Sequence, residues 1–136
     1  MPSDVSLCSP SCDGAVWTVG GKPLPYTHEF NSPHPTDDPN AEIAVEKING
    51  PVFLDCGGVD RLWRSCDYAD AIITRLVEHH ASQRHVLLSY PDGGHGVGAL
   101  VPYLPVTDLD GVTREDNPKA REQAWPRLLD FLAAAA

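Results

Sequence analysis

The pattern of apolar and polar positions predicts a strand, a helix and a second strand in the middle of the chain. Residues 52–56 (VFLDC) and 85–90 (HVLLSY) are apolar runs that lack the alternation of a half-exposed strand. Such runs, bounded by proline and glycine, indicate strands covered on both faces, as in a parallel sheet. Between them, i, i+4 spacing predicts an amphipathic helix over about 66–81, with Ser65 as its N-cap. Its apolar stripe comprises Tyr68, Ala69, Ile72, Ile73, Leu76 and Val77. This order predicts a βαβ unit with a right-handed crossover.

The first fifty residues show much less periodicity. Residues 15–19 (AVWTV) are β-prone and are followed by two glycines that indicate a turn. Five prolines fall within 23–40, and because proline fixes φ and donates no hydrogen bond, this segment is expected to be an extended surface excursion. Residues 41–48 are expected to be a short approach to the sheet. We therefore expect 1–50 to be an irregular excursion of the same domain whose sheet-bearing lobe is 51–136.

A second helix is predicted near the C-terminus. Residues 96–116 are irregular, and Asn117-Pro118 reads as a cap followed by proline at the first helical position. The expected apolar face comprises Ala124, Trp125, Leu128 and Leu132. Pro126 interrupts this pattern, and an interior proline costs about 3 kcal/mol. We therefore expect a kink there, with 126–134 as the firmer helix.

Composition and charge narrow the possible partners. The 136 residues are 42% apolar, which is enough for one globular domain with a core. A formal net charge of −9 without a basic stripe argues against a nucleic-acid partner. No run approaches the length of a membrane span, and the N-terminus has neither the basic nor the apolar region of a secretory signal. These features predict a cytoplasmic protein.

The cysteine and histidine spacings predict no metal and no cofactor. The chain has four cysteines, Cys8, Cys12, Cys56 and Cys66. They could form two bridges, but without a secretory signal free thiols are the expectation. Cys8 and Cys12 have no second Cys/His pair at zinc-finger spacing, which argues against a zinc site. His79 and His80 are adjacent on the predicted helix, point in different directions, and are expected to be a solvated helix end.

Each predicted strand is followed by two glycines and then one ionisable side chain, Asp60 after the first strand and His95 after the second. Parallel strands present their carboxyl ends at one edge of a sheet, so these two side chains are expected to meet. A carboxylate in that position orients the imidazole, which takes a proton from a nucleophile. In α/β-hydrolases the acid and the histidine follow the nucleophile in this chain order, and glycines let the loops approach closely.

Other roles and other acids remain open at this point. Asp60 would also serve as a cap of the following turn, and His95 as a loop histidine with a structural partner. Asp55 and Asp67 are alternative acids, but the first lies inside a predicted strand and the second begins the predicted helix. The pair of Asp60 and His95, each at a strand end and in the expected order, favours the triad interpretation.

The nucleophile of such a triad has no candidate with the right context. The chain contains no G-x-S-x-G motif and no cysteine equivalent. Cys56 would need a glycine where Leu54 stands. Ser89 lies within a predicted strand and Ser65 is the expected cap, so neither is on a strand-to-helix elbow.

Five motifs in order resemble acyl-CoA thioesterases and bile acid-CoA:amino acid N-acyltransferases. They are W-T-x-x-G-K-P-L-P-Y at 17–26, I-x-V-E-K-I-x-G-P-V at 43–52, D-x-x-W-x-S at 60–65, Y-P-x-x-G-H at 90–95 and A-x-x-x-A-W at 120–125. The chain resembles the C-terminal α/β-hydrolase domain of that family over most of its length. The resemblance implies an α/β fold with parallel strands, crossover helices and an incomplete sheet.

The resemblance also implies acyl transfer from coenzyme A thioesters through a Ser or Cys nucleophile, an Asp and a His. Asp60 and His95 match the last two, and the nucleophile position would lie before this chain begins. Two departures, Gly96-Val97-Gly98 after the histidine and Pro126 after Trp125, bear on substrate range.

These observations predict an acyl-CoA thioester hydrolase-like fragment that is inactive alone. One alternative is a non-catalytic module that pairs with another chain, or with itself, through an exposed sheet edge. Another is a different α/β-hydrolase, such as a dienelactone-hydrolase-like enzyme, although the motif at 17–26 favours the thioesterase relatives.

Overall fold

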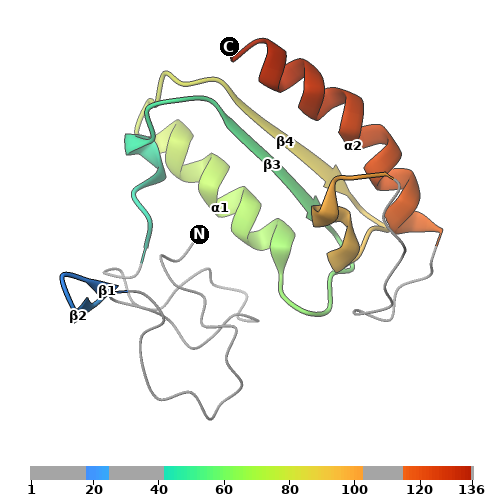
Figure 1. Cartoon of the computed structure of the whole chain (residues 1–136), viewed down its shortest axis with the longest axis horizontal. Helices are drawn as coiled ribbons and strands as arrows, with labels where there is room; N and C mark the ends of the chain where they lie inside the picture. The colour runs from blue at the N-terminus through green and yellow to red at the C-terminus, as the bar shows by residue number, and fades with distance from the viewer. Residues whose placement is uncertain (1–17, 25–41, 103–114, 136) are drawn as a thin grey trace.

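A computed structural model describes residues 18–24, 42–102 and 115–135 of the chain (Figure 1). In chain order its elements are β1 (Thr18–Val19), β2 (Lys22–Pro23), the 3-10 helix η2 (Val45–Lys47), β3 (Val52–Gly57), α1 (Ser65–Glu78), β4 (His85–Tyr90), the 3-10 helix η3 (His95–Ala99) and α2 (Asp116–Ala133). The arrangement is a mixed α/β structure with small sheets. Helices pack on both faces of the β3–β4 pair.

The β3–β4 pair forms the centre of the described structure. The two strands are parallel and pair over all six residues, from Val52 opposite His85 to Gly57 opposite Tyr90. Both predicted strands are confirmed, with β3 one residue longer than expected. Because the strands are parallel and in register, their carboxyl ends lie side by side and the loops that follow begin at the same edge.

Alternate residues of β3 contact the two helices. Val52 and Leu54 point to α1, where they join a core with Ile72 and Leu76, the latter fully buried. On the opposite face, Phe53 meets Phe131 of α2 edge to face, with ring centroids 5.3 Å apart. This period of two fixes which helix each strand residue contacts.

The strands are less covered than predicted. Within β3 only Val52, Cys56 and Gly57 are buried, and in β4 only Leu88 is. The reason is topological: in the described part of the chain β3 and β4 form a two-stranded sheet, so each strand has one edge without a neighbour.

Helix α1 begins one residue earlier than predicted and ends at Glu78. Ser65 is its first helical residue, so its expected role as the N-cap is wrong; the cap position is Arg64, without a side-chain cap bond. The stripe prediction holds for most positions, but Val77 is 58% exposed because it follows Leu76 round to the outer face. His79 and His80 are exposed at the helix end, as predicted.

Helix α2 runs as one element through Pro126, which lies on its exposed side. Its buried positions are Asn117, Ala120, Arg121, Ala124 and Phe131. Of the predicted face, Ala124 is buried, whereas Leu132 is 53% exposed and was wrongly assigned. The contact of Phe131 with Phe53 fixes the rotation of the helix and turns Leu132 outward.

The N-terminal described segment is a short hairpin. Thr18 pairs with Pro23 in an antiparallel arrangement, and Gly20 and Gly21 form the predicted turn with φ of 59° and 76°. Pro23 is therefore paired in a strand, where the extended excursion was expected to begin. The other predictions for 1–17 and 25–41 lie outside the described residues.

The approach to the sheet is tied to α1 by an ion pair. Arg75 of α1 donates hydrogen bonds to both carboxylate oxygens of Glu46 in η2, and its other terminal nitrogen lies 2.9 Å from Glu42 Oε2. This hydrogen bonding lowers the pKa of Glu46 to about 2 and raises that of Arg75.

The helices of the described ranges include none that is long and apolar enough to cross a membrane.

Candidate active site

Asp60 and His95 lie in contact at the carboxyl edge of the β3–β4 pair. Asp60 is three residues beyond the end of β3, and His95 is the first residue of η3, five beyond the end of β4. The distance between Asp60 Oδ2 and His95 Nδ1 is 3.2 Å. The predicted meeting of these two side chains at one edge is therefore observed.

The Asp60 carboxylate is buried and fully engaged. Its side chain is 2% exposed, and Oδ1 accepts hydrogen bonds from the backbone N–H of Leu62 at 3.0 Å and of Trp63 at 3.2 Å. The turn-capping role that was left open for Asp60 is thus present as well. One oxygen fixes the loop and the other contacts His95, so the carboxylate cannot rotate without losing both sets of bonds.

His95 is half-buried and borders an aromatic ring. Its side chain is 31% exposed, and the Trp63 and His95 rings form an edge-to-face pair with centroids 6.0 Å apart. Trp63 also packs against Tyr68 of α1. Trp63 was not among the candidate site residues, although its position in the D-x-x-W motif was the available signal.

Glycine permits the two loops to touch. A Cβ at Gly57 would lie 2.4 Å from the carbonyl oxygens of Gly93 and Gly94, and one at Gly58 would lie 2.6 Å from the Pro91 oxygen. Backbone hydrogen bonds cross the same seam, including Val59 N–H to the Gly93 oxygen at 3.0 Å. Any side chain at Gly57 would therefore separate the loops that carry the acid and the histidine.

Asn117 of α2 holds residues 91–95, the histidine loop that follows β4. Its side-chain oxygen accepts a hydrogen bond from the Gly94 N–H at 2.8 Å, and the residue is 1% exposed. The expectation that Asn117 caps the helix is wrong, because α2 begins at Asp116 and the cap position is Glu115. The polar side chain satisfies a buried N–H immediately before His95 instead. Sequence reasoning missed this role because the partner is 23 residues away.

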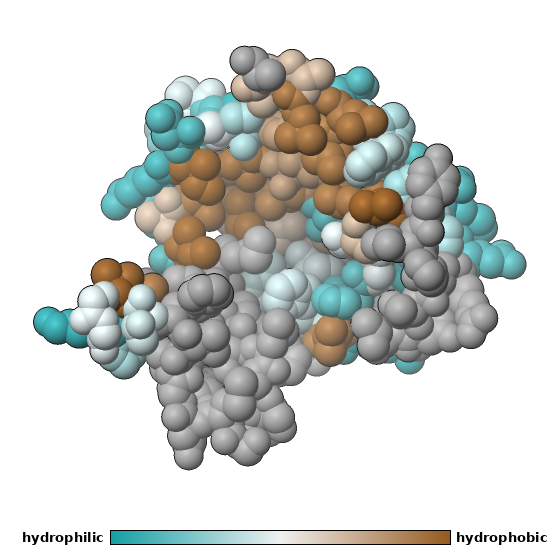
Figure 2. Space-filling model, in the orientation of Figure 1, coloured by the Kyte–Doolittle hydropathy of each residue, from teal (hydrophilic) through white to brown (hydrophobic). Residues whose placement is uncertain are grey.

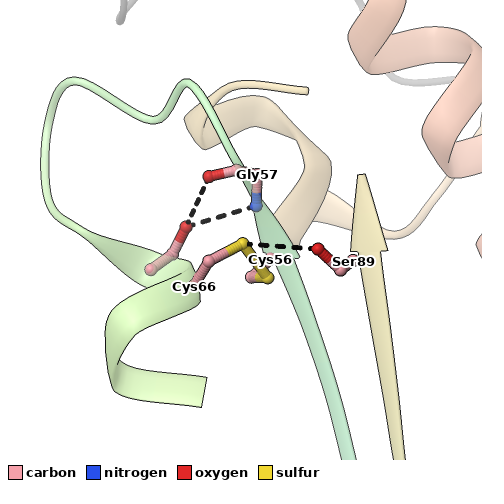
Figure 3. The surroundings of a disulfide bond; sticks show 5 residues. Cys56, Gly57, Cys66 and Ser89 are labelled. Carbon is pink, nitrogen blue, oxygen red and sulfur yellow. Dashed lines mark hydrogen bonds between the residues drawn. A yellow bond between two sulfur atoms is a disulfide. The ribbon is translucent and has the colours of Figure 1, made fainter. Parts of the chain in front are cut away.

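Cys56 and Cys66 form a disulfide (Figure 3). The expectation of free thiols is therefore wrong for these two, while Cys8 and Cys12 lie outside the described residues. Cys56 is next to last in β3 and Cys66 is second in α1, and the return of the chain brings their Cα atoms to 5.0 Å. A sulfur in a disulfide has no thiolate to act as a nucleophile, which removes Cys56 from the candidates.

The two alternative acids are placed elsewhere. Asp67 pairs with Arg64 at 3.2 Å on the surface of α1. Asp55 lies inside β3, where burial raises its pKa, and its Oδ2 has no hydrogen-bond partner in the described structure. Burial, together with the negative charge of Asp55, also raises the pKa of Tyr90.

A hollow of about 460 Å³ adjoins residues 57–65, the acid loop between β3 and α1. It is lined by Gly57, Gly58, Asp60, Arg61, Arg64, Cys66 and Asp67. The described residues contain no group of three or more His, Cys, Asp or Glu side chains that could hold a metal ion. The chemistry available here is that of a buried carboxylate and the imidazole that it orients.

A protein-family model matches most of the chain. The model described as BAAT / Acyl-CoA thioester hydrolase C terminal matches residues 21–135. The matched range includes both strands, both loops at their carboxyl ends and helix α2. Comparison with curated proteins and with solved structures gave no match.

Proposed function

We infer, from the premise that this chain belongs to the BAAT / acyl-CoA thioester hydrolase C-terminal family, that it supplies the acid and the histidine of an acyl-transfer site for acyl-CoA thioesters. The observation that supports this most is the buried Asp60 carboxylate, fixed by two backbone N–H groups and 3.2 Å from His95 Nδ1. Asp60 is the orienting acid, and His95 is the general base and then the general acid.

The roles follow from the hydrogen-bonding capacity of each group. A carboxylate accepts hydrogen bonds, so the Nδ1–H of His95 donates a hydrogen bond to Asp60 Oδ2, and Nε2 carries the lone pair. Nε2 takes the proton of a serine or cysteine nucleophile as that atom attacks the thioester carbonyl carbon. The carbon–sulfur bond then breaks, and the imidazolium returns its proton to the coenzyme A sulfur. The Asp60 carboxylate stabilises the intervening imidazolium.

The nucleophile is not within residues 1–136 in the required context, because the chain has no G-x-S-x-G motif or cysteine equivalent. Removal of the nucleophile abolishes the covalent route through an acyl-enzyme. We therefore propose that these residues alone do not turn over acyl-CoA and act when a nucleophile-bearing α/β half completes the sheet.

The test compares residues 1–136 alone with the same residues joined to a family half that carries G-x-S-x-G. Release of coenzyme A thiol from a long-chain acyl-CoA is measured. We expect turnover only in the joined protein, and a loss on the order of 10⁴-fold in kcat with His95→Ala. Turnover by residues 1–136 alone that His95→Ala abolishes would contradict the need for a partner half. Joined-protein turnover that survives His95→Ala would contradict the role of His95.

One observation favours a second role, as a module that pairs through its sheet edge. Figure 2 shows apolar surface gathered over the β3 side of the molecule, between the two helices. An apolar hollow of about 330 Å³ lies there, lined by Ile43, Val45, Ile48, Pro51, Val52, Phe53, Leu54 and Ile72. Among the described residues the outer edge of β3 has no neighbouring strand, and such an edge beside apolar side chains is a template for another strand.

Light scattering tests this second role. If residues 1–136 pair through β3, a dimer is expected that Ile48→Asp, beside the apolar hollow, dissociates. Val77→Asp on the outer face of α1 serves as the matched control and should leave the dimer intact. A parent chain that stays monomeric at high concentration would contradict self-pairing.

A further inference from the structure

We propose that the Cys56–Cys66 disulfide is a redox-controlled positioning element that keeps Asp60 against His95. The proposal deepens the function given above and rests on it for its catalytic consequence. Its structural part concerns residues 57–65, the acid loop, which leaves β3 and returns to α1. The disulfide joins the residues on either side of this loop and closes its neck.

Beside the disulfide, weaker hydrogen bonds also hold the two ends of the acid loop together. The Ser65 hydroxyl accepts a hydrogen bond from the Gly57 N–H at 3.2 Å and lies 3.3 Å from the Gly57 carbonyl oxygen, to which it donates (Figure 3). Cys66 Sγ lies 3.8 Å from the Ser89 hydroxyl on β4. The disulfide therefore connects the end of one strand, the start of α1 and the neighbouring strand at a single point.

The acid loop carries both described side chains that border His95 from this side. Asp60 contacts His95 Nδ1, and the Trp63 ring forms an edge-to-face pair with the imidazole. The histidine loop has a separate support, the Asn117–Gly94 hydrogen bond from α2. Without the disulfide the acid loop keeps the Ser65 hydrogen bonds and its backbone hydrogen bonds to the histidine loop. We therefore expect reduction to loosen the part of the loop that carries Asp60 and Trp63, while Asn117 still anchors the histidine loop.

The two sulfurs differ in access. Cys56 is 1% exposed, whereas Cys66 is half-buried and lines the 460 Å³ hollow beside Arg61 and Arg64. Asp60 and Asp67 balance the two guanidinium groups in this lining, so the greater exposure of Cys66, and not charge, makes its sulfur the one that a thiolate reaches. A thiolate of a small dithiol attacks Cys66 Sγ, the sulfur–sulfur bond breaks, and Cys56 leaves as a thiolate. The second thiol of the dithiol then displaces Cys66.

The exchange is balanced. The dithiol loses two electrons and two protons and becomes a disulfide, while Cys56 and Cys66 each end as a thiol. Disulfides in reducing compartments are transient and regulatory, and those in oxidising ones persist. Because the disulfide joins the two ends of the acid loop, the oxidised chain is the form that holds Asp60 against His95. The reduced chain is the form in which this contact, and the activity that depends on it, is weakened.

The experiment follows the imidazole nitrogens of His95 by NMR in a Cys8→Ser/Cys12→Ser chain, where only the 56–66 bridge can be reduced. Asp60→Ala provides the spectrum of a lost contact, and His79 is an exposed internal reference. We expect dithiol treatment to move the His95 nitrogen shifts more than halfway toward those of Asp60→Ala, with His79 unchanged. Thiol titration confirms that two thiols have formed, and circular dichroism confirms that the helices remain.

Two variants keep the result interpretable. Cys56→Ser/Cys66→Ser should show the reduced-type His95 signals with or without dithiol. Ser65→Ala should change the His95 nitrogen shifts little in the oxidised chain, because the disulfide still holds the loop when the Ser65–Gly57 hydrogen bonds are lost. On reduction, the shift change should be larger in Ser65→Ala than in the chain with Ser65. A reduced, folded chain with oxidised-type His95 signals would overturn the proposal. This readout needs no turnover, so its failure is distinct from failure of the acyl-transfer function.

Discussion

The acid loop and the histidine loop meet at one edge but are held in different ways. The acid loop is fixed by close neighbours in sequence, through a disulfide of separation 10 and the Ser65 hydroxyl eight residues from Gly57. The histidine loop is fixed from α2, by Asn117 at a separation of 23. The contact between Asp60 and His95 thus joins two loops that each have a support of their own, in addition to the backbone hydrogen bonds between them, such as Val59 N–H to the Gly93 oxygen.

The largest effect is expected from loss of the disulfide. Cys56→Ala/Cys66→Ala should lower the free energy of unfolding by about 2–3 kcal/mol, because a short closed loop no longer restricts the unfolded chain. Within the folded state, hydrogen exchange of the Leu62 and Trp63 amides should accelerate while that of Gly94 stays constant. Equal acceleration at all three amides would show that the two loops are not independently supported.

The converse change is Asn117→Ala. It leaves the buried Gly94 N–H without its acceptor, which should lower the free energy of unfolding by about 1–3 kcal/mol. Here the Gly94 amide should exchange faster while those of Leu62 and Trp63 do not change. Glu122→Ala, an exposed position on the same helix, is the matched control and should leave both loops unaffected. A loss of stability no greater than that of the control would contradict the anchoring role.

A smaller, pH-dependent effect is expected at Asp55. Burial raises the folded-state pKa of this carboxyl above its ordinary value of 3.8, so the folded chain binds the proton more tightly than the unfolded chain. Its contribution to stability is therefore lost as pH rises through the folded-state pKa. In urea unfolding, Asp55→Asn should exceed the parent in stability at pH 8, and the difference should shrink toward pH 3. A variant less stable than the parent at pH 8 would contradict this assignment.

The contribution of Glu46 to the free energy of unfolding should depend on pH in the opposite sense from that of Asp55. Its effect should be the smallest of the four, since its ion pair with Arg75 lies near the surface. Its pKa of about 2 is below the ordinary 4.5, so its contribution is present above pH 4.5 and is lost as pH falls toward 2. Glu46→Gln should therefore be less stable than the parent at pH 7 and equal to it near pH 2. A gap that persists at pH 2 would point to packing rather than charge.

Local patterns were enough to predict the strands and the acid–histidine pair. The apolar runs of β3 and β4 end in glycines because the loops must cross closely, and parallel pairing then brings Asp60 and His95 to one edge. These features depend on spacing along a few residues, which a sequence displays directly.

The supports of the two loops were not predicted, for two different reasons. Cys56 and Cys66 were assigned as thiols from the expected compartment, while their positions at a strand end and the next helix start carried the opposite signal. Asn117-Pro118 has the residue types of a helix start, and its actual partner, Gly94, is set by packing of α2 on the histidine loop. Leu132 was misplaced likewise, because the Phe53–Phe131 contact sets the helix rotation.

The most direct test of the central claim is the tautomer of the neutral His95 imidazole in the oxidised chain. Nitrogen-15 spectra of the imidazole should show the proton on Nδ1, bonded to Asp60, and an unprotonated Nε2. Asp60→Ala should shift this population toward the other tautomer. His95 protonated on Nε2 in the parent chain, or nitrogen shifts unaltered by Asp60→Ala, would contradict the claim that Asp60 prepares His95 to accept a proton.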